Sequence, residues 1–246
     1  MAQYAEVSLP QIEPISVDLT MEVRAEARRI CTSLLPLDDF LGGFWSGQVT
    51  LIDSSDKLLF DLVHLLCIDQ VRNGEREAVW VDGGNSVNPY ALSCLCKRFR
   101  INTQDTLDSI NVSRAFTAYQ FVTLIEDLME AEVERTGAGL LVISCFPDLF
   151  QDKDMWWSES LQLMKRCLAS IEAITRKHDL VTVVTNFGLS KMLYKKSLRS
   201  MLYGSADRVL RIESVRSALN FTLVNEGRSM LYHPVPYYQR TLDEFR

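Results

Sequence analysis

Hydrophobic and polar residues along the chain follow two different periods, and these periods alternate. Largely apolar runs bounded by turn residues predict strands at residues 49–52, 78–81, 139–143 and 181–186, and residues 110–114 have the pattern of a short strand. Apolar residues at helical spacing predict helices at residues 37–43, 58–71, 90–98, 118–134 and 158–177. Strands that alternate with helices in this way are typical of repeated crossover units. We therefore expect an α/β fold with a parallel central sheet flanked by helices.

The two ends of the chain follow other patterns. Residues 1–17 carry Pro10 and Pro14 without a clear period, which indicates an arm, and residues 17–33 have the pattern of a polar helix. Strand patterns at residues 209–213, 220–224 and 230–236 follow one another closely, so we expect antiparallel edge strands there. These patterns divide the chain into an N-terminal arm and helix, residues 1–33, and one core domain, residues 34–246.

Composition narrows the class of protein. A chain of 246 residues with 47% hydrophobic content can fill the core of one large domain. A net charge of -6 and a pI near 5.2 argue against a protein that coats nucleic acid nonspecifically. No apolar run approaches the roughly 20 residues of a membrane span, and no secretion signal is visible. We expect a cytoplasmic protein without a membrane partner.

Cysteine and histidine positions do not predict a metal site. The six cysteines lie mostly inside apolar segments and form no CxxC pair, which favours buried thiols. Cys94 and Cys96 would supply only half of a zinc site, and His64, His178 and His233 are scattered along the chain.

The segment after the first strand has the place of a phosphate-binding loop but not its composition. Such a loop needs several glycines, so that backbone N–H groups can approach phosphate oxygens, followed by Lys and a hydroxyl residue that holds Mg²⁺. Here no glycine lies between Ile52 and Lys57, and Leu58 stands in place of the hydroxyl residue. Asp53 and Asp56 add negative charge where a polyanion would bind. Only Lys57 keeps the position of a phosphate-binding residue.

Four segments, in order along the chain, resemble the RecA/RadA recombinase ATPase family, especially archaeal RadA and its shorter paralogs. Residues 34–47 resemble the start of that family's core, and residues 79–89 resemble its strand that ends in Asp-Thr-Glu. Residues 111–116 resemble its valine-alanine-arginine-alanine strand, and residues 183–186 its strand that ends in Thr-Asn-Gln. The resemblance implies a RecA-like fold of the P-loop NTPase type, with side-by-side assembly and nucleotide at the interface.

The chain also departs from that family where its chemistry needs particular side chains. The resemblance implies an Asp that organises Mg²⁺ after the strand at 139–143, where this chain has Ser144. It implies a Glu that activates water after Asp82, where this chain has Gly84, and a γ-phosphate-sensing Gln, where it has Phe187. Phosphoryl transfer would then lack its cradle, metal ligand, base and sensor. We expect degenerate Walker motifs, no ATP hydrolysis and no bound ATP with Mg²⁺.

Three charged residues each allow a second interpretation. Lys57 could still contact a phosphate, although a surface ion pair with the preceding acid is the simpler interpretation. Asp148 could act as a substitute metal ligand, but acids in loops are usually solvated. Arg114 could be functional, or it could pair with a carboxylate, either Asp82 or Glu126.

Two further segments are candidates for binding a partner. On a helix, basic side chains at residues 188–204 would recur every four residues and form one stripe interleaved with tyrosines. The candidate DNA-binding residues are Lys191, Tyr194, Lys195, Lys196 and Arg199. A solvated helix face explains the same stripe equally well. Trp156 and Trp157 suit a protein interface, or they pack under the helix that follows.

These patterns favour a noncatalytic accessory protein in recombinational DNA repair. It would dock on a recombinase or another RecA-fold protein, or on single-stranded DNA, with oligomer formation as a further expectation. One alternative is a regulatory ATP-binding protein or weak ATPase with an unconventional phosphate site around Lys57 and Asp148. Another is a scaffold or signalling module outside repair, because a fold alone does not determine function.

Overall fold

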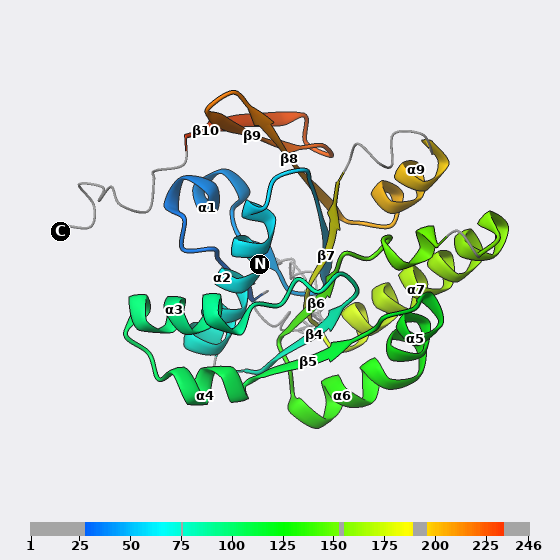
Figure 1. Ribbon diagram of the computed structural model, residues 1–246. Coiled ribbons are helices and arrows are strands. Elements are labelled where there is room, and N and C mark those ends of the chain that lie inside the picture. The colour runs from blue at the N-terminus through cyan, green and yellow to red at the C-terminus, as the bar shows by residue number, and fades with distance from the viewer. Residues whose placement is uncertain (1–27, 75, 153–154, 189–195, 234–246) are drawn as a thin grey trace, which may run out of the picture.

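The computed structural model describes residues 28–74, 76–152, 155–188 and 196–233 (Figure 1). Its centre is an eight-stranded sheet with the strand order β10-β9-β8-β3-β7-β6-β4-β5. Strands β3 to β8 pair in parallel, whereas β9 and β10 add to one side antiparallel. The strands are β3 Gln48–Ser54, β4 Ala78–Asp82, β5 Ile110–Arg114, β6 Leu140–Ser144, β7 Val181–Phe187, β8 Arg208–Val215, β9 Ala218–Leu223 and β10 Arg228–Tyr232. The expected parallel sheet with antiparallel edge strands is confirmed.

Helices cover both faces of the sheet, as Figure 1 shows. One face carries α1 Leu35–Leu41, α2 Leu58–Gly74, α3 Pro89–Phe99 and α4 Thr103–Asp108. The other carries α5 Ala118–Thr123, α6 Met129–Thr136, α7 Trp157–Lys177 and α9 Lys196–Gly204, and a π-helical segment, Leu124–Leu128, joins α5 to α6. None of the described helices is long and apolar enough to cross a membrane.

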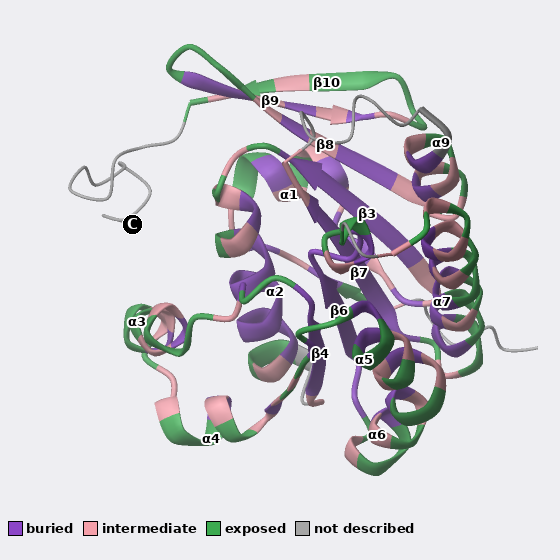
Figure 2. Ribbon diagram, turned by 45° about the vertical axis from the view of Figure 1, so that its right-hand side comes forward, coloured by how far each residue is buried: buried purple, intermediate pink, exposed green. Residues whose placement is uncertain are grey.

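The central strands β3, β4, β6 and β7 are buried on both faces, which explains their largely apolar sequences, whereas β5 and β10 are partly exposed (Figure 2). Successive side chains of a strand point to opposite faces, so Val183 packs under α2 while Val184 packs under α7. The polar residues that interrupt these runs gather where the strands end. Parallel strands place those ends at one edge of the sheet, which we call the carboxyl edge.

The prediction of a helix over residues 17–33 is wrong at its C-terminal end. Arg29–Ile30 form strand β1, which pairs antiparallel with β2, Phe44–Trp45. Ile30 is buried, and the N–H of the following Cys31 donates to Asp69 on α2 at 2.8 Å. Tertiary contacts with the core therefore override the local polar pattern. The remainder of that predicted helix, with the arm at residues 1–17, lies outside the described residues.

Two smaller features were also not predicted correctly. Helix α4 is missing from the sequence prediction, because six residues are too few to show a period; it begins at Asn102, whose side chain accepts the N–H groups of Gln104 and Asp105. Cys94 is exposed on α3, whereas Cys67, Cys96, Cys145 and Cys167 are buried as expected.

Three phenylalanines pack together between α5 and the segment after β6. The ring of Phe121 lies 5.9 Å from that of Phe146 and 6.0 Å from that of Phe150. All three are fully buried, whereas the nearby Phe116 is 75% exposed. Phe116 and Phe121, five residues apart, therefore have opposite environments.

We expect Phe121→Ala to lower the free energy of unfolding by about 3–5 kcal/mol, because it leaves a cavity in a rigid aromatic cluster. The matched variant Phe116→Ala should change it by less than about 0.5 kcal/mol, since its ring is solvated. Urea denaturation followed by circular dichroism measures both. Equal losses in the two variants would contradict this assignment of the core.

Candidate functional site

The connection between β3 and α2 is short and closes on itself. Three residues, Ser55, Asp56 and Lys57, separate the strand from the helix. The hydroxyl of Ser54 accepts the N–H of Asp56 at 2.9 Å and donates to its carbonyl at 3.0 Å. One carboxylate oxygen of Asp56 accepts the N–H of Leu58 at 2.9 Å, so the chain supplies its own anion to the positive end of α2.

The remaining groups of this connection have partners of their own or face solvent. The second carboxylate oxygen of Asp56 accepts the hydroxyl of Ser214 on β8 at 2.8 Å. The next two N–H groups of α2 donate to the carbonyls of Asp56 and Lys57. Lys57 is exposed and forms no ion pair within the described part of the chain, so the expected ion pair is wrong. Asp56 instead caps the helix.

Asp53 lies at the start of this connection and is buried, with 2% of its surface exposed. It accepts the side-chain amide of Asn186 at 2.7 Å and the hydroxyl of Tyr203 at 2.6 Å. The guanidinium of Arg199 donates to Tyr203 at 3.1 Å and lies 4.0 Å from Asp53. Burial raises the pKa of Asp53, and the hydrogen bonds from Tyr203 and Asn186 offset only part of this rise. The same contacts tie α9 to the ends of β3 and β7.

Asp82, at the end of β4, is fully buried and surrounded by donors. It accepts the N–H of Ser86 at 3.0 Å, the N–H of Gly84 at 3.2 Å and the hydroxyl of Ser144 at 3.0 Å. The hydroxyl of Ser144 also accepts the indole N–H of Trp80 at 2.8 Å. Burial alone would raise the pKa of Asp82, but the hydrogen bonds from Ser86, Gly84 and Ser144 hold it below its ordinary value. Ser144 therefore stabilises a neighbouring carboxylate.

Arg114 provides the charge that balances Asp82. Its Nε and Nη2 atoms both lie 3.1 Å from Asp82 Oδ2. Of the two carboxylates expected for Arg114, Asp82 is the partner, and Glu126 pairs with Arg166 on α7 instead. Arg114 and Asp82 end neighbouring strands, so the pair holds β4 and β5 together at the carboxyl edge.

Gly84 lies against the segment that follows β6. A Cβ atom at this position would lie 2.4 Å from Cys145 Sγ and 2.5 Å from its Cβ, so no other residue fits the present backbone. Cys145 is buried, and burial raises its pKa to about 12, so its thiol stays neutral. Asp148 is exposed nearby, and it joins no group of potential metal ligands among the residues that the structure describes.

Leu58 and Phe187 make apolar contacts where a phosphate-binding loop would have a hydroxyl residue and where the resemblance implies a Gln, respectively. Both are half-buried and pack against the core cluster beneath α2. The ring of Phe187 lies 5.1 Å from that of Phe60, the third residue of α2. These contacts fasten the end of β7 to the first turn of α2.

The residues at the carboxyl edge do not fit ATP with Mg²⁺. The amides at the start of α2 already have acceptors within the chain, and one of these acceptors is a carboxylate. Ser144 offers a hydroxyl that serves Trp80 and Asp82, and Gly84 has no space for a carboxylate side chain. Triphosphate binding would require the connection between β3 and α2 to refold.

The predicted basic stripe is described only in part. Lys191, Tyr194 and Lys195 lie outside the described residues, and Lys196 begins α9 with a side chain that is not described. Arg199 turns inward to Tyr203 and Asp53, as stated above. A DNA-binding role for the four other residues stays a prediction, and the contacts of Arg199 explain its position without DNA.

Trp156 and Trp157 have different environments. Trp156 is 80% exposed, whereas Trp157 is half-buried and packs against the core as the first residue of α7. Beside them lies a surface pocket of about 160 Å³, lined by Thr117, Ala118, Tyr119, Asp152 and Met155. The exposure of Trp156 is compatible with the predicted protein interface. Trp157 instead packs against the core, which was the alternative interpretation.

Sequence reasoning missed several residues that organise the carboxyl edge. Asn186 directly follows an apolar run, a signal that could have identified it as it identified Asp53. Ser86, Tyr203 and Ser214 carry no such signal, because their partners lie far along the chain; Tyr203 bonds a residue 150 positions away. Only the folded arrangement brings them together.

Comparison with known proteins identifies similar sequences. A family model described as Rad51 matches residues 24–198, which is most of the chain. The "DNA repair protein Rad51 homolog" of Drosophila melanogaster is 26% identical over 141 residues, which cover 54% of this chain and 39% of that protein. The chain thus spans about two-fifths of the length of this curated relative. The family match, with the helix-covered parallel sheet, confirms the expected RecA-like fold.

We expect Asp53→Asn to change how stability depends on pH. Because the pKa of Asp53 is raised on folding, the folded protein keeps a proton that the unfolded chain loses, so stability falls as pH rises through this pKa. The variant removes this loss, and the unpartnered buried oxygen of Asn186 can accept the new amide once the Asn186 side chain rotates. The stability of the variant relative to the native protein should therefore increase as pH rises from about 4.

Urea denaturation between about pH 4 and pH 8 measures this difference. Asp39→Asn, at an exposed position, is the matched control and should follow the native profile. A constant difference between Asp53→Asn and the native protein at every pH would contradict the role of burial at Asp53.

Proposed function

The chain belongs to the Rad51 family, and from this we propose that it is a noncatalytic accessory protein in homologous recombination or DNA repair. It acts by docking on a protein partner, and nucleotide does not control the docking. In this proposal its relatives are archaeal RadA paralogs with degenerate Walker motifs, and its partner is a recombinase or another RecA-fold protein.

The observation that carries this proposal is the carboxylate of Asp56 at the N-terminus of α2. A helix N-terminus binds phosphate through free N–H groups and a positive partial charge. Asp56 uses both, and it is itself held by Ser214 on β8. ATP would have to displace the carboxylate of Asp56 from the helix. A second acid, Asp53, lies buried three residues earlier.

Exposed aromatic side chains support docking on a protein. Trp156 is 80% exposed, Phe116 is 75% exposed and Tyr119 is 57% exposed, and Tyr119 also lines the pocket of about 160 Å³. Exposed aromatic anchors beside a pocket are typical of the residues that carry binding energy at protein interfaces. Asp152 at this pocket and Glu159, which accepts the hydroxyl of Tyr119, make the surface acidic. This favours a protein with basic residues over the phosphates of DNA.

We expect isothermal titration of the native chain with ATP and Mg²⁺ to give no saturable heat up to millimolar nucleotide. Lys57→Ala should give the same result, because Lys57 is exposed to solvent. Saturable binding that Lys57→Ala abolishes would overturn the proposal and favour a regulatory ATP-binding protein.

We also expect Trp156→Ala to weaken binding to the Rad51-family recombinase of the same cell by about tenfold or more, because it removes an aromatic anchor. Tyr90→Ala is the matched control: Tyr90 is 84% exposed but lies on α3, and its loss should leave binding unchanged. Surface plasmon resonance with both purified proteins, with and without ATP, measures the affinity. No recombinase binding by the native chain would favour a scaffold outside repair.

A further inference from the structure

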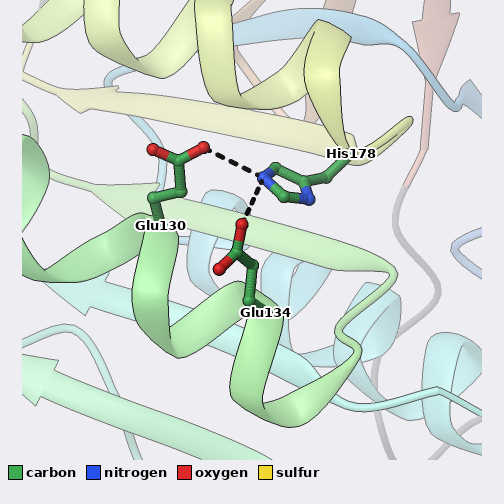
Figure 3. A group of neighbouring side chains, drawn as sticks. All are labelled: Glu130, Glu134 and His178. Atoms are coloured by element: carbon green, nitrogen blue, oxygen red, sulfur yellow. Dashed lines mark hydrogen bonds and ion pairs between the residues drawn. The ribbon is translucent and has the colours of Figure 1, made fainter.

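A second group of chemically active side chains lies away from the carboxyl edge, between α6 and the end of α7 (Figure 3). Glu130 and Glu134 are one turn apart on α6, so their side chains project from the same face. His178 follows the last residue of α7 and points between them, as Figure 3 shows. Its Nε2 atom lies 3.1 Å from Glu130 Oε1 and 3.8 Å from Glu134 Oε1.

The spacing of these donor atoms is close to that of a coordinated metal ion. The three donors all lie within 4.8 Å of one another. A tetrahedral zinc ion with bonds of about 2.0–2.1 Å holds its ligands about 3.3–3.4 Å apart. The two measured distances from His178 lie on either side of that value. Glu134, the exposed member of the group, is the side chain that would have to move toward His178.

A cation of the chain already lies at this position. The ammonium of Lys177 is 2.7 Å from Glu130 Oε1 and 3.6 Å from Glu134 Oε1. The carboxylate of Glu130 therefore already faces a positively charged group at the position where an ion would bind. The Lys177 side chain is 62% exposed, and such ion pairs are weak, so an incoming ion can displace it into solvent.

We propose that Glu130, Glu134 and His178 form a binding site for a divalent transition-metal ion, with zinc as the favoured ion. An imidazole nitrogen with two carboxylates suits zinc, whereas Mg²⁺ prefers oxygen ligands alone. Water completes the coordination, because the three side chains leave one side of the site open to solvent. The bound ion links α6 to the turn that precedes β7. This proposal does not depend on the proposed repair function, because the site lies at the opposite ends of the strands from the connection between β3 and α2.

Isothermal titration of the full chain with zinc chloride in a non-chelating buffer tests the proposal. We expect one saturable site in the native protein and at least a tenfold loss of affinity in both Glu134→Gln and His178→Gln. Lys177→Ala should bind more tightly, because the competing ammonium is gone. Glu132→Gln on the same helix is the matched control, since Glu132 pairs with Arg135 and not with this group.

A thermal denaturation series adds a readout that does not depend on heat of binding. Zinc should raise the midpoint of the native protein and of Glu132→Gln, but not that of His178→Gln, because an ion that binds only the folded state stabilises it. Zinc bound by exposed thiols such as Cys94 would give equal affinity in His178→Gln and would overturn the proposal. Failure of Lys177→Ala to bind more tightly, or absence of saturable binding, would overturn it as well.

Discussion

Two carboxylates are buried at the ends of parallel strands, and their need for hydrogen-bond donors determines how the carboxyl edge is arranged. Asp53 is 2% exposed and Asp82 is fully buried. A buried charge without partners would destabilise the fold by several kcal/mol. Each carboxylate is therefore surrounded by donors, and the donors come from different elements. Arg114 and Ser86 serve Asp82, while elements far along the chain serve Asp53.

The two carboxylates have different partners, and their pKa values shift in opposite directions. At Asp82, burial would raise the pKa, but hydrogen bonds from Ser86, Gly84 and Ser144 outweigh it, so the pKa is lowered. Asp53 is served mainly by neutral groups, and burial prevails, so its pKa is raised. Near Asp53 the chain places another acid, Asp56, whose carboxylate accepts an N–H at the N-terminus of α2.

Much of the fold could be predicted from sequence because the central strands are buried on both faces and the long helices carry apolar residues at helical spacing. The runs at residues 139–143 and 181–186 each contain enough apolar residues to identify a strand without tertiary information. Strand β1 could not be predicted, since two residues show no period and pairing with β2 alone determines their conformation.

The site was predictable to a lesser degree. Composition identified Asp53, Asp56 and Leu58 as unsuited to a phosphate-binding loop, and the resemblance identified Ser144 and Gly84. Neither could show what those residues do instead. The capping of α2 by Asp56 depends on a loop conformation, and the pairing of Ser144 with an indole depends on sheet register. Such roles follow from geometry that a linear pattern does not contain.

The contact between Gly84 and Cys145 couples the residue choices at these two positions. A side chain at position 84 would meet the sulfur at 2.4 Å, so a lone glutamate there would disrupt the backbone before it could act. Shrinking Cys145 alone would leave a void and no acid. Because the Cβ of Cys145 would also lie only 2.5 Å away, a side chain at position 84 requires either glycine at position 145 or a shift of the backbone between them.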